Sequence, residues 1–196
     1  MLSVEELHNA ILYSTVRVRS GNGGGSGTVI YSRPNVAGKV ETFAITNHHV
    51  ISSLIDIREE WDPYLKRNVK IEVRKAAMVD MFRYSRMSYK IGEEQVEADV
   101  VAWHKEQDVA LVKFRDDERP YPHVAALSPP DESKNLHIFT PIYCVGCALL
   151  HAPYPTAGQI SSVTDEIDNF SYQMTSAAIT FGNSGGRYFW LRQANG

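Results

Sequence analysis

Four side chains in this sequence have the types that nucleophilic catalysis requires. Ser184 lies between glycines in the segment "FGNSGG", and His48 and His49 follow the apolar segment "FAITN". Asp108 opens a second apolar segment, "DVALVKF". A serine hydroxyl is a weak nucleophile near neutral pH, so it needs an imidazole as base, an acid that orients the imidazole, and donors for the developing oxyanion. The sequence offers a candidate for each of these parts.

The glycines around Ser184 fit the same chemistry. The backbone N–H groups of Gly182 and Ser184 are candidate oxyanion donors, and glycine at 182, 185 and 186 lets a substrate backbone approach closely. Taken alone, each signal is weak. A glycine-flanked serine is equally a turn, a pair of histidines is usually structural, and an acid at the start of a strand is common. Only their combination is specific.

Two other motifs have competing interpretations. Cys144 and Cys147 form C-x-x-C, which is either redox-active, half of a zinc site, or a pair of small core residues. The apolar segment "IYCVGC" around them and the absence of a second cysteine pair favour the core. The stretch "GNGGGSGT" at 21–28 lacks the Gly-Lys-Ser/Thr of a phosphate-binding loop. We therefore expect no metal and no cofactor.

Composition excludes several classes of function. Of the 196 residues, 43% are hydrophobic and 22% charged, which is typical of one large or two small globular domains. The net charge of −3 comes from interspersed acids and bases, so we expect no nucleic-acid partner. The N-terminus is acidic where a secretory signal is basic, and the apolar runs are short for a membrane span. These features favour a cytoplasmic location without a membrane span, and they do not indicate an oligomeric state.

Short segments with strand-like alternation dominate the chain and predict an all-β fold. A segment rich in proline and charge, at 116–135, indicates a linker between two halves. Ser3 and Glu6 form a capping box that predicts a short helix. We therefore expect an N-terminal helical segment at 1–13, a first β-domain at 14–115 with His49 and Asp108, the linker, and a second β-domain at 136–196 with Ser184.

Four segments resemble a known family. "GSGTVI" at Gly25, "TNHHV" at Thr46, "DVAL" at Asp108 and "GNSGG" at Gly182 are similar to motifs of trypsin-like serine proteases, most closely the HtrA-type branch. The order His, Asp, Ser is that of chymotrypsin-type enzymes and differs from the orders in α/β-hydrolases and subtilisins. The resemblance covers roughly residues 15–196. It implies two antiparallel β-barrels of the six-stranded type with the active site in the cleft between them.

The resemblance also implies roles for single residues. The family's histidine immediately precedes a valine, so it corresponds to His49, whereas His48 stands where the family usually has a small or polar residue. Asp108 would orient His49, and Ser184 would attack the scissile carbonyl to form an acyl-enzyme. Asn183 replaces the acid that pairs with a newly cut N-terminus in digestive members. The resemblance therefore implies an enzyme that needs no activating cleavage.

The same resemblance implies a substrate preference. The floor of the primary pocket falls near Ala178 and Ile179, where no acid stands, so we expect small or medium apolar residues before the cut. The expected function is a serine endopeptidase that acts on polypeptides. The alternative is a catalytically silent trypsin-like module that serves in binding or structure.

Three features depart from the family pattern. The chain between His49 and Asp108 is long, and we expect the excess at 59–68 and 78–95, as loops or an added hairpin whose aromatic residues cover the barrel rather than contact substrate. Arg187 replaces a proline or another small residue. The sequence stops at Asn195-Gly196, a strong hairpin-turn signal. We therefore expect the second barrel to be incomplete at its C-terminal end.

Overall fold

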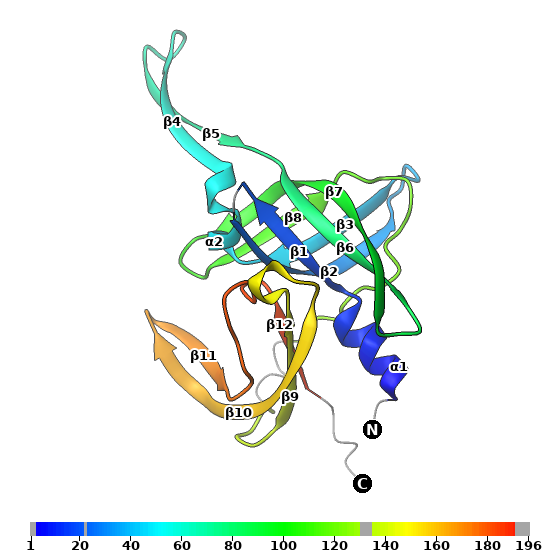
Figure 1. Ribbon diagram of the computed structural model, residues 1–196. Coiled ribbons are helices and arrows are strands. Elements are labelled where there is room, and N and C mark those ends of the chain that lie inside the picture. Colours follow the sequence, from blue (N-terminus) through cyan, green and yellow to red (C-terminus); the bar gives the residue numbers. More distant parts are fainter. Residues whose placement is uncertain (1–2, 22, 130–134, 191–196) are drawn as a thin grey trace.

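A six-stranded antiparallel barrel forms the first half of the protein (Figure 1). The computed structural model describes residues 3–21, 23–129 and 135–190, and the structural statements below refer to them. Strands β1, β2, β3, β8, β7 and β6 follow one another around the barrel, and β6 pairs back onto β1. Their bounds are Thr15–Ser20 (β1), Gly23–Pro34 (β2), Val40–Thr46 (β3), Ala77–Ser85 (β6), Tyr89–His104 (β7) and Val109–Phe114 (β8).

Alternation along the strands explains why this barrel closes. Valines at every second position, such as Val16 and Val18 in β1, are fully buried, and Val29, Val79 and Val112 meet them in the same core cluster. β-branched side chains pack well on a pleated surface, and burial of each valine stabilises the fold by about 1.5–3 kcal/mol. The barrel is therefore a rigid base for residues at the ends of its strands.

The second half is a four-stranded antiparallel sheet in the order β11-β10-β9-β12. Its strands are Pro141–Gly146 (β9), Tyr154–Ile167 (β10), Phe170–Thr175 (β11) and Arg187–Trp190 (β12). The predicted all-β fold is confirmed, with the second half an open half-barrel over the described residues. The predicted turn at Asn195–Gly196 lies outside those residues.

A two-stranded hairpin of β4 (Ile55–Asp62) and β5 (Arg67–Arg74) projects away from the barrel (Figure 1). It contains the predicted excess at 59–68, whereas the segment 78–95 belongs to barrel strands β6 and β7. The expectation that the aromatic residues cover the barrel is wrong for Trp61, Tyr64 and Tyr89, which are 62%, 94% and 67% exposed. Trp61 and Tyr64 lie near the tip of a hairpin that stands off the body, so they have no core to cover.

Helical segments are short. The capping box is confirmed, since the Ser3 N–H donates to Glu6 Oε2 at 2.7 Å and the Glu6 N–H donates to Ser3 Oγ at 3.2 Å. It opens α1 (Val4–Leu7), which η1 (His8–Leu12) continues, and the other turns are α2 (His48–Ile51), η2 (Ser52–Leu54) and η3 (Ala148–Leu150). Within the ranges that the structure describes, no helix has the length and apolar character to cross a membrane.

Candidate active site

Strand β3 carries His49 to the rim of the barrel. The strand ends at Thr46, and α2 turns Val50 and Ile51 into the core while His49 stays exposed. Asp108 lies in the turn before β8 with φ of 49°, a left-handed conformation that aspartate tolerates better than most residues. The close of one strand and the start of its neighbour thus bring these two residues together, because β3 and β8 pair in the barrel.

One carboxylate holds His49 at two points. Asp108 Oδ2 lies 2.6 Å from His49 Nδ1, and the backbone N–H of His49 donates to Asp108 Oδ1 at 2.9 Å. A proton held on Nδ1 by Asp108 leaves Nε2 as the acceptor on the opposite side of the ring. The side chains are 57% and 40% exposed, so water reaches the pair.

His48 has a different environment. Its ring packs against Trp103 with 5.0 Å between the ring centroids, and Trp103 Nε1 donates to Glu72 Oε1 at 3.2 Å. The side chain therefore belongs to the packing between α2 and β7. Of the two histidines, His49 bonds the Asp108 carboxylate, whereas His48 packs against Trp103.

Ser26 in β2 holds the loop that carries Ser184. The Ser26 N–H donates to the Ser184 carbonyl at 2.6 Å, and Ser26 Oγ donates to the Gly182 carbonyl at 2.7 Å. The same Oγ accepts from the Cys147 N–H at 2.7 Å, and Thr46 Oγ1 donates to the Ser26 carbonyl at 2.7 Å. Since Ser26 is fully buried, these bonds are shielded from water. One residue of the barrel thereby fixes both ends of the Gly182–Ser184 segment.

Asn47 provides a second link between the serine loop and the histidine edge. Its Nδ2 donates to the Asp108 carbonyl at 2.5 Å, and its Oδ1 accepts from the Gly185 N–H. One amide therefore connects the residue after Ser184 to the residue that holds His49. The sequence did not predict that Asn47 and Ser26 hold the serine loop. Both residues lie in segments that resemble family motifs, "TNHHV" and "GSGTVI", and this resemblance was the signal that could have identified them.

Glycine is required where the two halves meet. Gly185 has φ of 83°, and an added Cβ would collide with the Ser26 carbonyl. At Gly25, an added Cβ would lie 2.7 Å from both the Ser184 carbonyl and Val50 Cγ2. The Ser184 backbone therefore lies against the barrel close to Val50, the residue that follows His49.

The candidate oxyanion donors are the backbone N–H groups of Gly182 and Ser184. In the described ranges, neither the Gly182 N–H nor the Ser184 N–H donates a hydrogen bond. Gly182 has φ of 90°, which glycine adopts readily. Ser184 Oγ forms no hydrogen bond to His49 within the same ranges. The structure thus joins His49 to Asp108 and brings the Ser184 backbone to the same rim, without a direct Ser184–His49 bond.

The predicted pocket floor lies at the surface. Ile179 is 61% exposed, Ala178 is also exposed, and the Ala178 carbonyl accepts from Thr156 Oγ1 at 2.9 Å. Phe181, next to Gly182, is 86% exposed. These side chains are therefore accessible to a ligand beside the serine loop.

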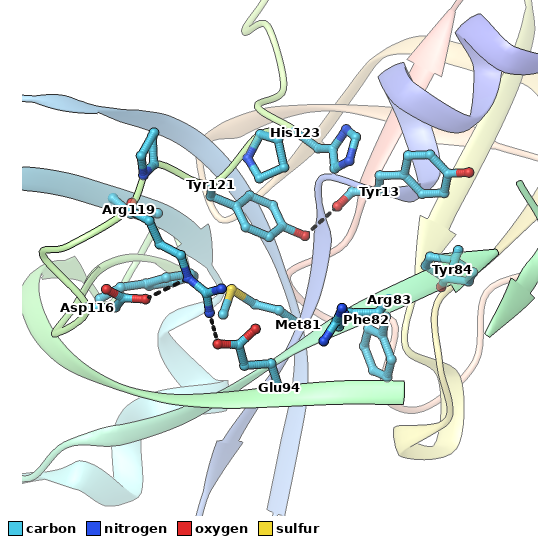
Figure 2. Close-up of a pocket in the computed structure, with 14 residues that line it drawn as sticks. Tyr13, Met81, Phe82, Arg83, Tyr84, Glu94, Asp116, Arg119, Tyr121 and His123 are labelled. Atoms are coloured by element: carbon cyan, nitrogen blue, oxygen red, sulfur yellow. Dashed lines mark hydrogen bonds and ion pairs between the residues drawn. The ribbon is translucent and has the colours of Figure 1, made fainter. Parts of the chain in front are cut away.

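Cavities in the described part of the structure flank the barrel. One of about 520 Å³ adjoins His49 and is lined by Val50, Leu54 and the glycine-rich start of β2. A second cavity, of about 370 Å³, is lined by aromatic side chains such as Tyr13 and Tyr121 and by charged side chains such as Glu94 and Arg119 (Figure 2). None of the predicted site residues lines it. There Tyr121 Oη donates to the Tyr13 carbonyl at 2.7 Å, and Arg119 pairs with Glu94. Of these two cavities, the first is lined by one candidate catalytic residue, His49, and the second by none.

The cysteine pair is part of the core. Cys144 and Cys147 are free thiols and are buried. Burial raises the pKa of Cys147 to about 12 and also raises that of Cys144, so both stay protonated at neutral pH. The interpretation as small buried residues is confirmed. No group of three or more possible metal-ligating side chains occurs in the part of the chain that the structure describes.

Arg187, the residue that departs from the family pattern, joins the second sheet to the N-terminal segment. Its guanidinium donates to the Ala10 carbonyl and, at 2.7 Å, to Ser14 Oγ. Burial lowers its pKa to about 10, and the group stays charged at neutral pH. The larger side chain therefore has a structural use here.

Comparison with known proteins places this arrangement in a family context. Residues 25–190 match the model of the trypsin-like peptidase domain. Among solved structures, the crystal structure of Deg5 is similar with a TM-score of 0.65 and 20% identity, over 96% of this chain and 82% of that one. The apo MamO protease domain from Magnetospirillum magneticum gives a TM-score of 0.58 and 16% identity, over 91% and 79%. A search among curated proteins finds no match.

Proposed function

The chain belongs to the trypsin-like peptidase domain family, and we propose that it acts as a serine endopeptidase with Ser184 as its nucleophile. The observation that carries this proposal is the pair of hydrogen bonds from His49 to Asp108, through Nδ1 and through the backbone N–H. Such a double contact fixes both the position of the ring and its tautomer, which a general base for serine requires.

The proposed reaction begins with attack of Ser184 Oγ on the scissile carbonyl carbon while His49 Nε2 accepts the hydroxyl proton. The oxyanion accepts hydrogen bonds from the Gly182 and Ser184 N–H groups. The C–N bond then breaks as His49 returns the proton to the leaving amine, and an acyl-enzyme remains. Water, activated by the same imidazole, hydrolyses the ester. Asp108 stays ionised throughout and stabilises the imidazolium that forms.

We propose polypeptides as substrates, with small or medium apolar residues before the cut. Ala178 and Ile179 support this preference, because neither offers a charge to pair with lysine or arginine. The exposed side chains of Ile179 and Phe181 add apolar surface beside Gly182. Burial of an apolar substrate side chain there would contribute affinity in proportion to its area.

A second candidate function is a catalytically silent module that binds polypeptides without cleaving them. Two observations favour it. No hydrogen bond joins Ser184 Oγ to His49 among the described residues, and the Asp108 side chain is 40% exposed. Hydrogen bonds between catalytic residues often tighten only around substrate, so the first candidate function does not require this bond in the free enzyme.

Hydrolysis of an activated ester and of a peptide library distinguishes the two candidates. We expect Ser184→Ala to reduce turnover to the buffer rate and Asp108→Asn to lower kcat by about 10⁴-fold, because the wrong tautomer of His49 is then favoured. His48→Asn is the matched control, since His48 contacts Trp103 instead of Asp108. Turnover by Ser184→Ala equal to that of the parent, or none by the parent, contradicts the proposal.

A further inference from the structure

The position of Gly182 depends on a turn of the second half. An added Cβ at Gly182 would lie 2.6 Å from the Cys147 carbonyl and 2.7 Å from the Leu149 N–H, so the glycine backbone rests directly on this turn. The Leu149 N–H also donates to the Phe181 carbonyl at 2.7 Å. The peptide that presents the Gly182 N–H is therefore oriented by residues 147–150.

This turn holds a conformation that its own residues disfavour. Leu149 and Leu150 both have left-handed backbones, with φ of 50° and 60°. Leucine rarely adopts this region, because its Cβ approaches the backbone carbonyl too closely. Two consecutive left-handed leucines persist only where the surroundings hold them. Leu149 is 63% exposed, so packing of its side chain is not what holds the turn.

Arg17 in β1 reaches the turn from the other half of the protein. Its Nη1 donates to the Leu150 carbonyl at 2.6 Å, and its Nε donates to Asp80 Oδ2 in β6 at 2.7 Å. Asp80 is fully buried and also accepts two bonds from Arg19, both at 2.8 Å. The Arg17 side chain is only 14% exposed. A guanidinium with a fixed fork of donors can make both contacts at once.

We propose that Arg17, anchored by Asp80, is a positioning residue for the oxyanion hole. The inference rests on the proposed function, since it assigns Arg17 to the donor at Gly182. Arg17 holds the Leu150 carbonyl, the turn keeps its left-handed leucines, and Leu149 then fixes the Phe181 carbonyl so that the Gly182 N–H stays free for substrate. The barrel thereby controls a donor that the second half supplies.

Arg17→Lys tests the inference, with Arg19→Lys as its matched control. Each variant removes one guanidinium from Asp80, but only Arg17 contacts the turn. A lysine amine is a single point donor and cannot bridge Asp80 and the Leu150 carbonyl together. We expect Arg17→Lys to lower kcat for an activated ester by at least about tenfold with KM changed less than about threefold. Loss of a whole oxyanion donor costs about 10²–10³-fold. Arg19→Lys should change kcat less than about threefold.

Leu149→Gly provides a rescue arm, because glycine adopts the left-handed region without strain. In that background the turn depends less on Arg17, so the added Arg17→Lys substitution should lower kcat by less than about threefold. An equal loss in both backgrounds contradicts the inference. This arm stays informative if Arg17→Lys alone folds poorly.

Hydrogen exchange of residues 147–150 and 180–185 separates the inference from the proposed function. We expect faster exchange at the Leu149 N–H in Arg17→Lys and parent-like exchange in Arg19→Lys. Unchanged exchange in Arg17→Lys overturns the inference, whether or not the parent is active. Faster exchange with unchanged kcat also overturns it. A parent whose turnover equals that of Ser184→Ala overturns the proposed function, and with it any catalytic part for Arg17.

Discussion

Replacement of Ser26 by alanine removes the hydroxyl that joins the two halves beneath the serine loop. The Ser26 Oγ accepts from the buried Cys147 N–H and donates to the Gly182 carbonyl, both at 2.7 Å. Leaving the Cys147 N–H unpaired costs about 1–3 kcal/mol, and loss of the second bond costs about 0.5–1.5 kcal/mol. We therefore expect the free energy of unfolding to fall by about 2–4 kcal/mol, against a typical total of about 5–15 kcal/mol.

The same substitution should slow acylation. The Gly182 carbonyl belongs to the loop that presents the oxyanion donors, and without Ser26 Oγ that carbonyl loses its donor from the barrel. We expect the rate of ester acylation to fall by at least about tenfold, which corresponds to about 1.4 kcal/mol at the transition state. The backbone bond from the Ser26 N–H to the Ser184 carbonyl is retained, so the loop should loosen without detaching.

Ser32→Ala is the matched control, because Ser32 lies in the same strand and its hydroxyl also accepts from a backbone N–H and bonds a second partner. Its Oγ bonds Thr42 Oγ1 at 2.7 Å and accepts from the Tyr121 N–H at 2.7 Å, in a part of β2 that does not contact the serine loop. We expect a similar fall in the melting temperature, about 2–4 °C for each kcal/mol, and an acylation rate within about twofold of the parent. Thermal melting measures the stability of each variant, and stopped-flow kinetics measures its acylation rate. Equal slowing of acylation in both variants, or a parent-like acylation rate in Ser26→Ala, would contradict this role of Ser26.

Three further predictions concern groups away from the reacting atoms. Burial lowers the pKa of His123 below 6.5, so the unfolded chain binds a proton at this residue more tightly than the folded chain does. The free energy of unfolding therefore falls as the pH drops below 6.5. His123→Asn should reduce the loss of melting temperature between about pH 7.5 and 5. Because Cys144 and Cys147 are buried and protonated, a thiol reagent at pH 8 should modify neither until denaturant unfolds the chain; rapid labelling of the native protein would contradict their burial. Gly185→Ala should lower both stability and acylation, since its Cβ would meet the Ser26 carbonyl at a left-handed φ, and a parent-like melting temperature and rate would show that the loop has room there.

The sequence predicted those features that local pattern determines. The apolar segment before His48 and His49 forms the end of β3, and both histidines follow it in α2, as the order of residues indicated. The capping box of Ser3 and Glu6 likewise depends on residues three apart. Such signals are readable because the interacting groups are neighbours along the chain, where residue type and spacing fix the geometry.

Contacts between distant segments were not predictable in the same way. Ser26 and Asn47 hold the loop of Ser184 through bonds that span more than a hundred residues of sequence, and no local pattern encodes such a pairing. The direction of the β4–β5 hairpin is equally non-local, and it left Trp61 exposed where cover of the barrel was expected. The packing of the His48 ring against Trp103 also appears only once β7 is placed beside α2.

Covalent labelling tests the central claim, that His49 and Asp108 activate Ser184, most directly. A fluorophosphonate probe reacts with an activated serine, and digestion followed by mass spectrometry identifies the modified residue. We predict modification of the parent at Ser184, none of Ser184→Ala, and slow modification of His49→Ala, because the imidazole that accepts the hydroxyl proton is then missing. An unmodified parent, or equal modification of the parent and His49→Ala, would contradict the account.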